Sequence, residues 1–134
     1  SLLMDIGKLK LPPELRSKNP LAMTPEEKAQ YQAHPKFSAE IIAQNYQIPS
    51  MVSLIVEQHH ELNTGEGFPA KLTAMKIYPL AKIVSLANYF VEYLIEQRCK
   101  PLEGLKKISS QKDFLEKFDV PMVKALIQAF IQKT

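Results

Sequence analysis

The sequence predicts an all-α fold, a single domain built from six or seven helices. Three observations support this prediction. Apolar residues recur at helical spacing in two long stretches, prolines stand where helices would begin, and no alternating run flanked by hairpin turns indicates a strand. With 134 residues, of which 46% are hydrophobic, the chain is long enough to form one domain around one core.

The first half of the chain contains signals for three helices. Residues 24–27 (Thr-Pro-Glu-Glu) have the form of a capping box, and the helix that they start is expected to run toward His34. A second helix is predicted over residues 37–46. A third begins after Pro49 and continues into His59.

The second half is predicted to contain two long amphipathic helices. Pro79 and Pro121 are suited to the first turns of these helices. One apolar face is marked by Leu80, Ile83, Val84, Ala87, Val91, Leu94 and Ile95, and the other by Val123, Leu126, Ile127, Phe130 and Ile131. The stretches 11–21 and 62–78 are predicted to be ordered loops because of their Pro, Gly, Asn and Lys content.

An aromatic cluster, Tyr89, Phe90 and Tyr93, lies on the first of these long helices. Such a cluster is more often core or interface packing than a ligand pocket. The apolar opening, residues 2–6, resembles the inside of a helix, so we expect the chain to be a fragment of a longer protein whose preceding helices are absent. Part of the aromatic surface would then be exposed, and such a patch promotes assembly into a homo-oligomer.

Composition and charge argue against several classes of protein. The formal net charge of +3 is small, and the 17 basic and 14 acidic residues are interspersed, so we expect no nucleic-acid binding. Lys, Glu or Gln interrupts the longest apolar stretches, which predicts no membrane span. The N-terminus lacks the pattern of a signal peptide, and the single cysteine, Cys99, excludes an intrachain disulfide. A cytoplasmic location is therefore expected.

Asp5 and the three histidines of the chain form the strongest candidate for a metal site. His59 and His60 are adjacent at a predicted helix end, where successive residues project about 100° apart. At a frayed end both imidazoles can still converge on one ion, and a carboxylate from elsewhere could complete the set. Imidazole and carboxylate together suit Fe, Mn, Zn or a similar ion. A single histidine is more often a surface or satisfied core residue, but His34, His59 and His60 together favour the ligand interpretation.

These residues lie within motifs that together resemble the HD-GYP family, a branch of the HD phosphohydrolases. The motifs are residues 3–8 (Leu-Met-Asp-Ile-Gly-Lys), His34-Pro35, His59-His60-Glu61 and residues 65–69 (Gly-Glu-Gly-Phe-Pro), followed by residues 77–83, Ala87-Asn88 and Phe118-Asp119. The resemblance implies an HD-type helical bundle over residues 1–134 that lacks its N-terminal helices. It also implies a bacterial protein, because the family hydrolyses the bacterial second messenger cyclic diguanylate.

The chain departs from the family pattern at metal-binding positions. Met4 stands where the family has the histidine of its His-Asp pair, and Asn88 stands where it has a later metal-binding aspartate. An earlier helix that supplies another ligand in the family is expected to be missing. Since family members bind at least two ions, the resemblance implies that one ion site has lost its ligands. The other site keeps its ligands, which match Asp5, His34, His59 and His60.

The resemblance also implies roles for residues beside the ions. Lys8 matches a lysine near the substrate phosphate, although a solvated helix lysine is equally consistent with the sequence. The loop that contains Gly65, Gly67, Phe68 and Pro69 borders the active site in the family and contacts partner proteins. Phe68 replaces the tyrosine of the family's Gly-Tyr-Pro motif. Glu61 either orients a metal-binding histidine or is a surface charge, and we favour the first.

Three functions are consistent with these features. We expect a degenerate, catalytically impaired signalling domain that binds cyclic diguanylate or a signalling protein and holds one divalent ion, Fe or Mn ahead of Zn. The alternative is a weak single-metal cyclic diguanylate phosphodiesterase in which Lys8 contacts phosphate. The third is a purely structural helical domain without an ion. The sequence leaves open whether an ion is bound.

Overall fold

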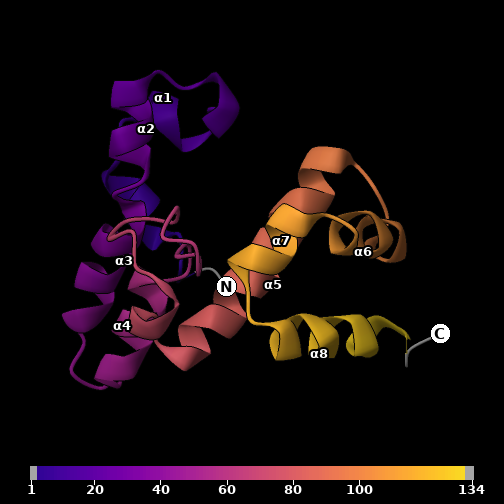
Figure 1. The fold of residues 1–134 in the computed structure, drawn as a ribbon. Coiled ribbons are helices and arrows are strands. Elements are labelled where there is room, and N and C mark those ends of the chain that lie inside the picture. The colour runs from indigo at the N-terminus through magenta and orange to yellow at the C-terminus, as the bar shows by residue number, and fades with distance from the viewer. Residues whose placement is uncertain (1–2, 132–134) are drawn as a thin grey trace.

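The computed structural model describes residues 3–131, which fold as helices joined by loops (Figure 1). The prediction of an all-α fold is confirmed, since extended pairing in this part of the chain is limited to isolated bridges. The elements are η1 (Ile6–Lys10), α1 (Pro13–Arg16), η2 (Pro20–Ala22), α2 (Pro25–Tyr31), α3 (His34–Ala43), α4 (Ser50–Glu57), η3 (Ala74–Lys76), α5 (Pro79–Gln97), α6 (Pro101–Ser109), α7 (Lys112–Lys117) and α8 (Val120–Ile131).

The long helix α5 connects two groups of helices. Figure 1 shows α1 to α4 on one side of it and α6 to α8 on the other. The larger apolar cluster lies among α5 to α8 and consists of Leu86, Phe90, Leu105, Ile108, Phe114, Phe118 and Val123. A smaller cluster joins the N-terminal segment to α3 and α4 through Met4, Ile42 and Val56. The candidate site lies beside this smaller cluster.

Helix starts follow the local signals in the sequence. Thr24 Oγ1 accepts a hydrogen bond from Glu27 N, and the Glu27 carboxylate accepts one from Thr24 N, which confirms the capping box at the start of α2. α3 begins at His34, earlier than predicted, because Pro35 occupies its first turn. α4 ends at Glu57, so His59 lies just beyond the helix.

The segment before the site differs from the expected apolar helix. Ser1 and Leu2 lie outside the described residues. From Leu3 the chain forms a turn that leads into η1, with Asp5 as the residue before this 3-10 helix. Of the predicted loops, residues 11–21 contain α1 and the start of η2, whereas residues 62–78 contain only η3.

The apolar face that helical spacing predicts on α5 is only partly buried, since Val84 and Leu94 pack against the two apolar clusters. The residues Leu80, Ile83, Val91 and Ile95 are exposed, whereas Ala81, Ser85, Leu86 and Phe90 are buried. The expectation that part of the aromatic cluster is exposed is wrong for Phe90, which is buried, while Tyr89 and Tyr93 pack against the same core. The physical reason is that α6 to α8 cover this side of the helix.

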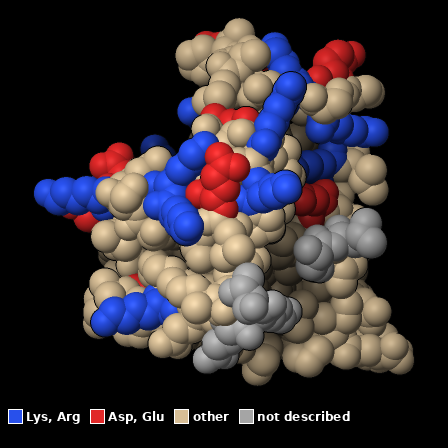
Figure 2. All heavy atoms as spheres, turned by 90° about the vertical axis from the view of Figure 1, so that its right-hand side faces the viewer, with Lys and Arg blue, Asp and Glu red and all other residues tan. Residues whose placement is uncertain are grey.

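The helices α6 and α7 were not predicted, although Leu102, Leu105 and Ile108 recur at helical spacing on α6. Lys107 pairs with Glu103 on α6, and Lys112 pairs with Glu116 on α7, in each case four residues apart. On the face seen in Figure 2, basic side chains lie beside acidic ones. Among the described helices, none combines the length and apolar character that crossing a bilayer requires.

Candidate metal centre

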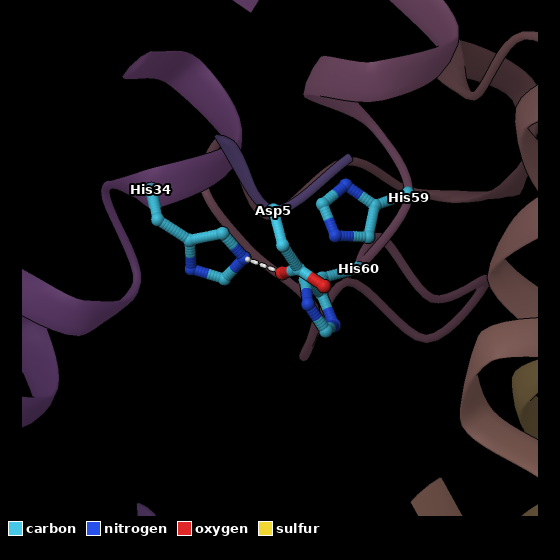
Figure 3. A group of neighbouring side chains, drawn as sticks. All are labelled: Asp5, His34, His59 and His60. Atoms are coloured by element: carbon cyan, nitrogen blue, oxygen red, sulfur yellow. Dashed lines mark ion pairs between the residues drawn. The ribbon is translucent and has the colours of Figure 1, made fainter. Parts of the chain in front are cut away.

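The four predicted metal ligands meet at one point. Asp5, His34, His59 and His60 each offer one ligand atom, and these atoms all lie within 4.8 Å of one another (Figure 3). Asp5 precedes η1, His34 is the first residue of α3, and the two adjacent histidines follow α4. Three separate segments therefore build this cluster. His59 and His60 lie beyond the end of α4, where the sequence predicts that both imidazoles can face one point.

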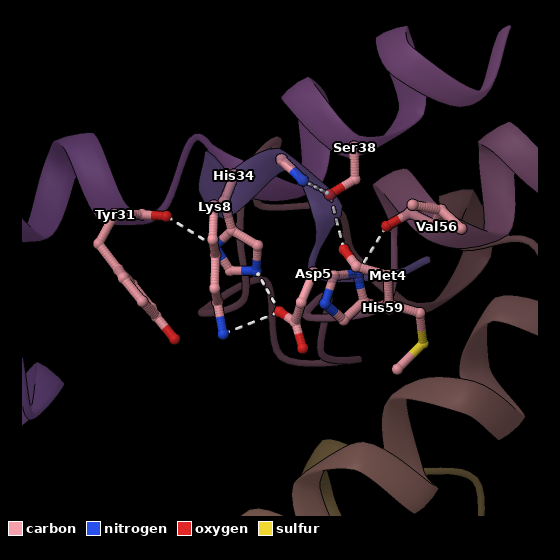
Figure 4. A network of polar contacts seen from close by, with 9 residues as sticks. Met4, Asp5, Lys8, Tyr31, His34, Ser38, Val56 and His59 are labelled. Atoms are coloured by element: carbon pink, nitrogen blue, oxygen red, sulfur yellow. Dashed lines mark hydrogen bonds and ion pairs between the residues drawn. The ribbon is translucent and has the colours of Figure 1, made fainter. Parts of the chain in front are cut away.

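Backbone carbonyls orient two of the imidazole rings. His34 Nδ1 lies 2.7 Å from Tyr31 O, and His59 Nδ1 lies 2.6 Å from Val56 O (Figure 4). Since a carbonyl oxygen only accepts, each Nδ1 carries the proton. The Nε2 lone pair of each ring is then left for a ligand, which is the usual arrangement of metal-binding histidines.

The ligand atoms lack hydrogen-bond partners. The Nε2 atoms of His34, His59 and His60 are buried, and no described residue forms a hydrogen bond with them. Asp5 Oδ1 forms an ion pair with Lys8 Nζ at 2.8 Å and lies 3.3 Å from His34 Nε2. Buried polar atoms are nearly always paired. Three imidazole nitrogens without hydrogen-bond partners and one carboxylate oxygen, all facing one point, therefore fit a divalent cation.

The protonation states of the cluster also suit a cation. Burial lowers the pKa of His59 to about 4, with the bond to Val56 O opposing this shift. Burial, followed by the nearby rings of His59 and His34, lowers the pKa of His60 further. Burial raises the pKa of Asp5, but its contacts with His34 and Lys8 outweigh that effect and hold the pKa well below its usual range. These two imidazoles are thus neutral and the carboxylate is ionised at neutral pH, as metal binding requires.

Lys8 lies beside the cluster and pairs with Asp5. Its ammonium also lies 5.3 Å from the centroid of the Tyr31 ring. Burial lowers the pKa of Lys8, but the contact with Asp5 reverses this and leaves the pKa raised. Lys8 is therefore a fixed positive charge next to the metal ligands. Its contact with a phosphate stays a prediction.

Met4 and Asn88, the two positions where the sequence departs from the family pattern, line a common groove. The groove has a volume of about 520 Å³, and its other walls are apolar, including Val56, Val84 and Val91. Met4 is 9% exposed and packs in the smaller apolar cluster. A thioether in apolar packing and a neutral amide are poor ligands for a hard divalent ion.

Glu61 anchors the following loop instead of contacting a histidine. Its side chain is 1% exposed, and the two carboxylate oxygens accept hydrogen bonds from Ala70 N and Leu72 N, each at 2.7 Å. Ser85 Oγ of α5 donates to Glu61 O at 2.7 Å. The sequence interpretation favoured a contact between Glu61 and a metal-binding histidine. Among the described residues the Glu61 carboxylate binds these two backbone N–H groups instead.

The anchored loop packs against His60. The Phe68 ring stacks on the imidazole, with centroids 4.3 Å apart and planes 21° apart, and Pro69 follows it. At Gly67 an added Cβ would lie 2.5 Å from His60 O, so only glycine permits this approach. Gly65 has φ +79°, a conformation that side chains disfavour. The two glycines therefore have structural roles. A contact of the loop with a partner stays a prediction.

A pocket of about 450 Å³ opens beside the ligand cluster. Its walls include Tyr31, His60, Phe68 and Glu92. Burial raises the pKa of Glu92, and Asn88, Lys8 and Asp5 are among the groups that act on it, so this carboxylate lies near the site. The sequence interpretation missed Glu92, although its position one helical turn after Asn88 on α5 was an available signal.

Comparisons with known proteins support the helical fold. The sequence matches the HD domain family over residues 1–119. The solved structure of Bd1817, an HDG"Y"P protein from Bdellovibrio bacteriovorus, matches with a TM-score of 0.75 and 27% sequence identity. The match covers 97% of this chain and 41% of Bd1817, so the chain spans less than half the length of that relative. No curated protein sequence matches the chain.

Proposed function

Because the chain belongs to the HD domain family, we propose that it is a signalling domain that keeps one divalent-metal site and has lost a second. It binds a protein partner or a nucleotide such as cyclic diguanylate. It does not hydrolyse the nucleotide at a useful rate. HD domains generally bind metals, and the cluster of Asp5 with the three histidines offers one set of ligands. Fe or Mn is the favoured ion, with Zn as the alternative.

The observation that carries this proposal is the contrast between two adjacent positions. Asp5 faces the histidines with an ionised carboxylate, whereas Met4 lies in apolar packing with Ile42 and Val56. Asn88 lines the same groove as Met4 and has no charge. Neither Met4 nor Asn88 can therefore give an anionic ligand to a second cation beside the retained site.

The loss of one ion has a kinetic consequence. A pair of ions stabilises both the attacking and the leaving oxygen of a phosphodiester, whereas a single bound ion can act as a Lewis acid on only part of that charge. If the missing stabilisation is about 4 kcal/mol, the rate falls about a thousandfold. In addition, Glu92 and Glu96 stand on the wall of the pocket beside His60, where they repel an anionic substrate.

Turnover tests this proposal. Protein loaded with Mn²⁺ or Fe²⁺ is incubated with cyclic diguanylate, and linear products are separated by chromatography. We expect binding of one ion and no hydrolysis above the metal-only blank. Multiple turnovers on the time scale of minutes would contradict impairment.

The retained cluster and Lys8 also support a second candidate, a weak single-metal phosphodiesterase. In that case a slow activity would be measurable, and His34→Ala would abolish it. Tyr46→Ala is the matched control, because the Tyr46 side chain is 93% exposed and its loss leaves the site intact. A slow activity that survives His34→Ala would come from a contaminant and would exclude this candidate.

A further inference from the structure

A buried serine holds both ends of the segment that carries Asp5. Ser38 Oγ donates a hydrogen bond to Met4 O at 2.7 Å and accepts one from Gly7 N at 2.8 Å. The Ser38 side chain is completely buried. A hydroxyl has one proton to donate and lone pairs to accept with, so both contacts are chemically satisfied. Figure 4 shows Ser38 above the turn, with Asp5 pointing away from it toward the imidazoles.

The backbone around Asp5 forms a turn that leads into η1, with φ −102° and ψ 3° at Asp5. The turn also packs directly on the backbone of α3, since a Cβ at Gly7 would lie 2.2 Å from His34 O and 2.4 Å from Ser38 N. The segment is therefore fixed to the first turns of α3 by close contact and by the hydroxyl.

The same helix presents a ligand of its own. Ser38 lies four residues after His34 on α3, so the two side chains share one face of the helix. His34 Nε2 and Asp5 Oδ1 end 3.3 Å apart. α3 thus supplies one ligand directly and places a second ligand through Ser38. The charged contact of Asp5 with Lys8 is partly exposed and gives weaker positional control.

We propose that Ser38 is a positioning residue of the metal centre, because its hydroxyl fixes Asp5 at the distance from His34 that a shared ion requires. The proposal rests on the retained metal site of the proposed function. Ser38→Ala leaves Gly7 N–H and Met4 C=O buried without partners, so the turn shifts or opens. Loss of such supporting contacts lowers metal affinity by about tenfold to a hundredfold.

Two further variants separate positioning from stability. Ser38→Cys keeps a side chain of similar size with a weaker hydrogen-bonding group, so its affinity is expected to fall between those of the parent and Ser38→Ala. It also carries the test if Ser38→Ala does not fold. Val123→Ala removes a side chain that is 2% exposed on α8, in the larger apolar cluster. It destabilises the protein without touching the site.

The experiment measures Mn²⁺ affinity by competition with a chelating dye and records the Co²⁺ absorption spectrum of each variant. We expect Ser38→Ala to lose at least tenfold in affinity and to change the Co²⁺ spectrum. Val123→Ala is expected to stay within about threefold of the parent, with an unchanged spectrum. Parental affinity and spectrum in the Ser38 variants, or an equal loss in Val123→Ala, would overturn the positioning role.

A readout without metal separates this inference from the proposed function. In the ion-free protein, NMR measures the exchange of the Gly7 amide and the imidazole signals of the three histidines. We expect Ser38→Ala to accelerate that exchange at least tenfold and to move the His34 signals, while Val123→Ala does neither. If the parent binds no ion but these changes occur, the retained metal site fails and the positioning of Asp5 by Ser38 stands. Unchanged signals would refute the positioning role, whether or not an ion binds.

Discussion

Replacing Glu61 by glutamine tests whether the loop beside the site depends on one buried carboxylate. Its two oxygens accept hydrogen bonds from Ala70 N and Leu72 N, each at 2.7 Å, and the side chain is 1% exposed. A glutamine offers one oxygen and one NH₂ group, so one of the two backbone N–H groups faces another donor. A buried donor without a partner costs about 1–3 kcal/mol. We therefore expect Glu61→Gln to reduce the free energy of unfolding by about 2 kcal/mol.

Urea unfolding followed by circular dichroism measures this change. The matched control is Glu66→Gln in the same loop. The Glu66 side chain is exposed and accepts a hydrogen bond from Thr64 Oγ1, which an amide oxygen can also accept. The control is expected to stay within about 0.5 kcal/mol of the parent, as surface changes usually do. If Glu61→Gln is as stable as Glu66→Gln, the carboxylate does not anchor the loop.

Three further predictions follow from the site. In the ion-free protein, the unfolded chain protonates His59 below pH 6.5, whereas the folded chain resists until about pH 4. This imidazole alone therefore lowers the free energy of unfolding by about 3 kcal/mol on acidification across that window, and His60, whose pKa is lowered further, adds to the loss; unfolding midpoints at several pH values measure this. Mn²⁺ at a hundredfold excess over its Kd should stabilise the protein by about 2.7 kcal/mol, and neither EDTA-treated protein nor His34→Ala should show this gain in thermal unfolding. Gly67→Ala should cost about 1–3 kcal/mol, because its Cβ would meet backbone at 2.5 Å; a parental melting temperature would contradict the close approach.

The metal-ligating residues of the candidate site were predictable from the sequence, because their side chains have the chemistry of metal ligands. Three histidines and an aspartate in ordered motifs indicated a cluster, and the structure brings these four residues together. The end of α4 before His59 explains how adjacent imidazoles converge, as the sequence interpretation anticipated.

The supporting residues were not predictable, because their roles depend on distant parts of the chain. Ser38 reads as an ordinary helix residue until Gly7, 31 residues earlier, is placed against it. Glu61 has the right chemistry to orient an imidazole, and only the course of the loop shows that it binds backbone N–H groups.

Helix periodicity had a similar limit on α5. This helix is apolar on two sides, so spacing alone could not decide between the side of Ile83 and the side of Phe90. The decision comes from α6, α7 and α8, which cover the side of Phe90, and the sequence interpretation had not identified α6 or α7. The fold class was therefore predictable, whereas the packing of the long helix was not.

Metal content tests the central claim most directly. Protein purified without chelator is analysed for Mn, Fe and Zn by mass spectrometry, beside His34→Ala, and each sample is then assayed with cyclic diguanylate. The retained cluster predicts about one ion per chain in the parent, none in the variant and no hydrolysis in either. Two ions per chain with multiple turnovers, or no ion in the parent under any loading condition, would contradict a domain that has kept one metal site and lost the other.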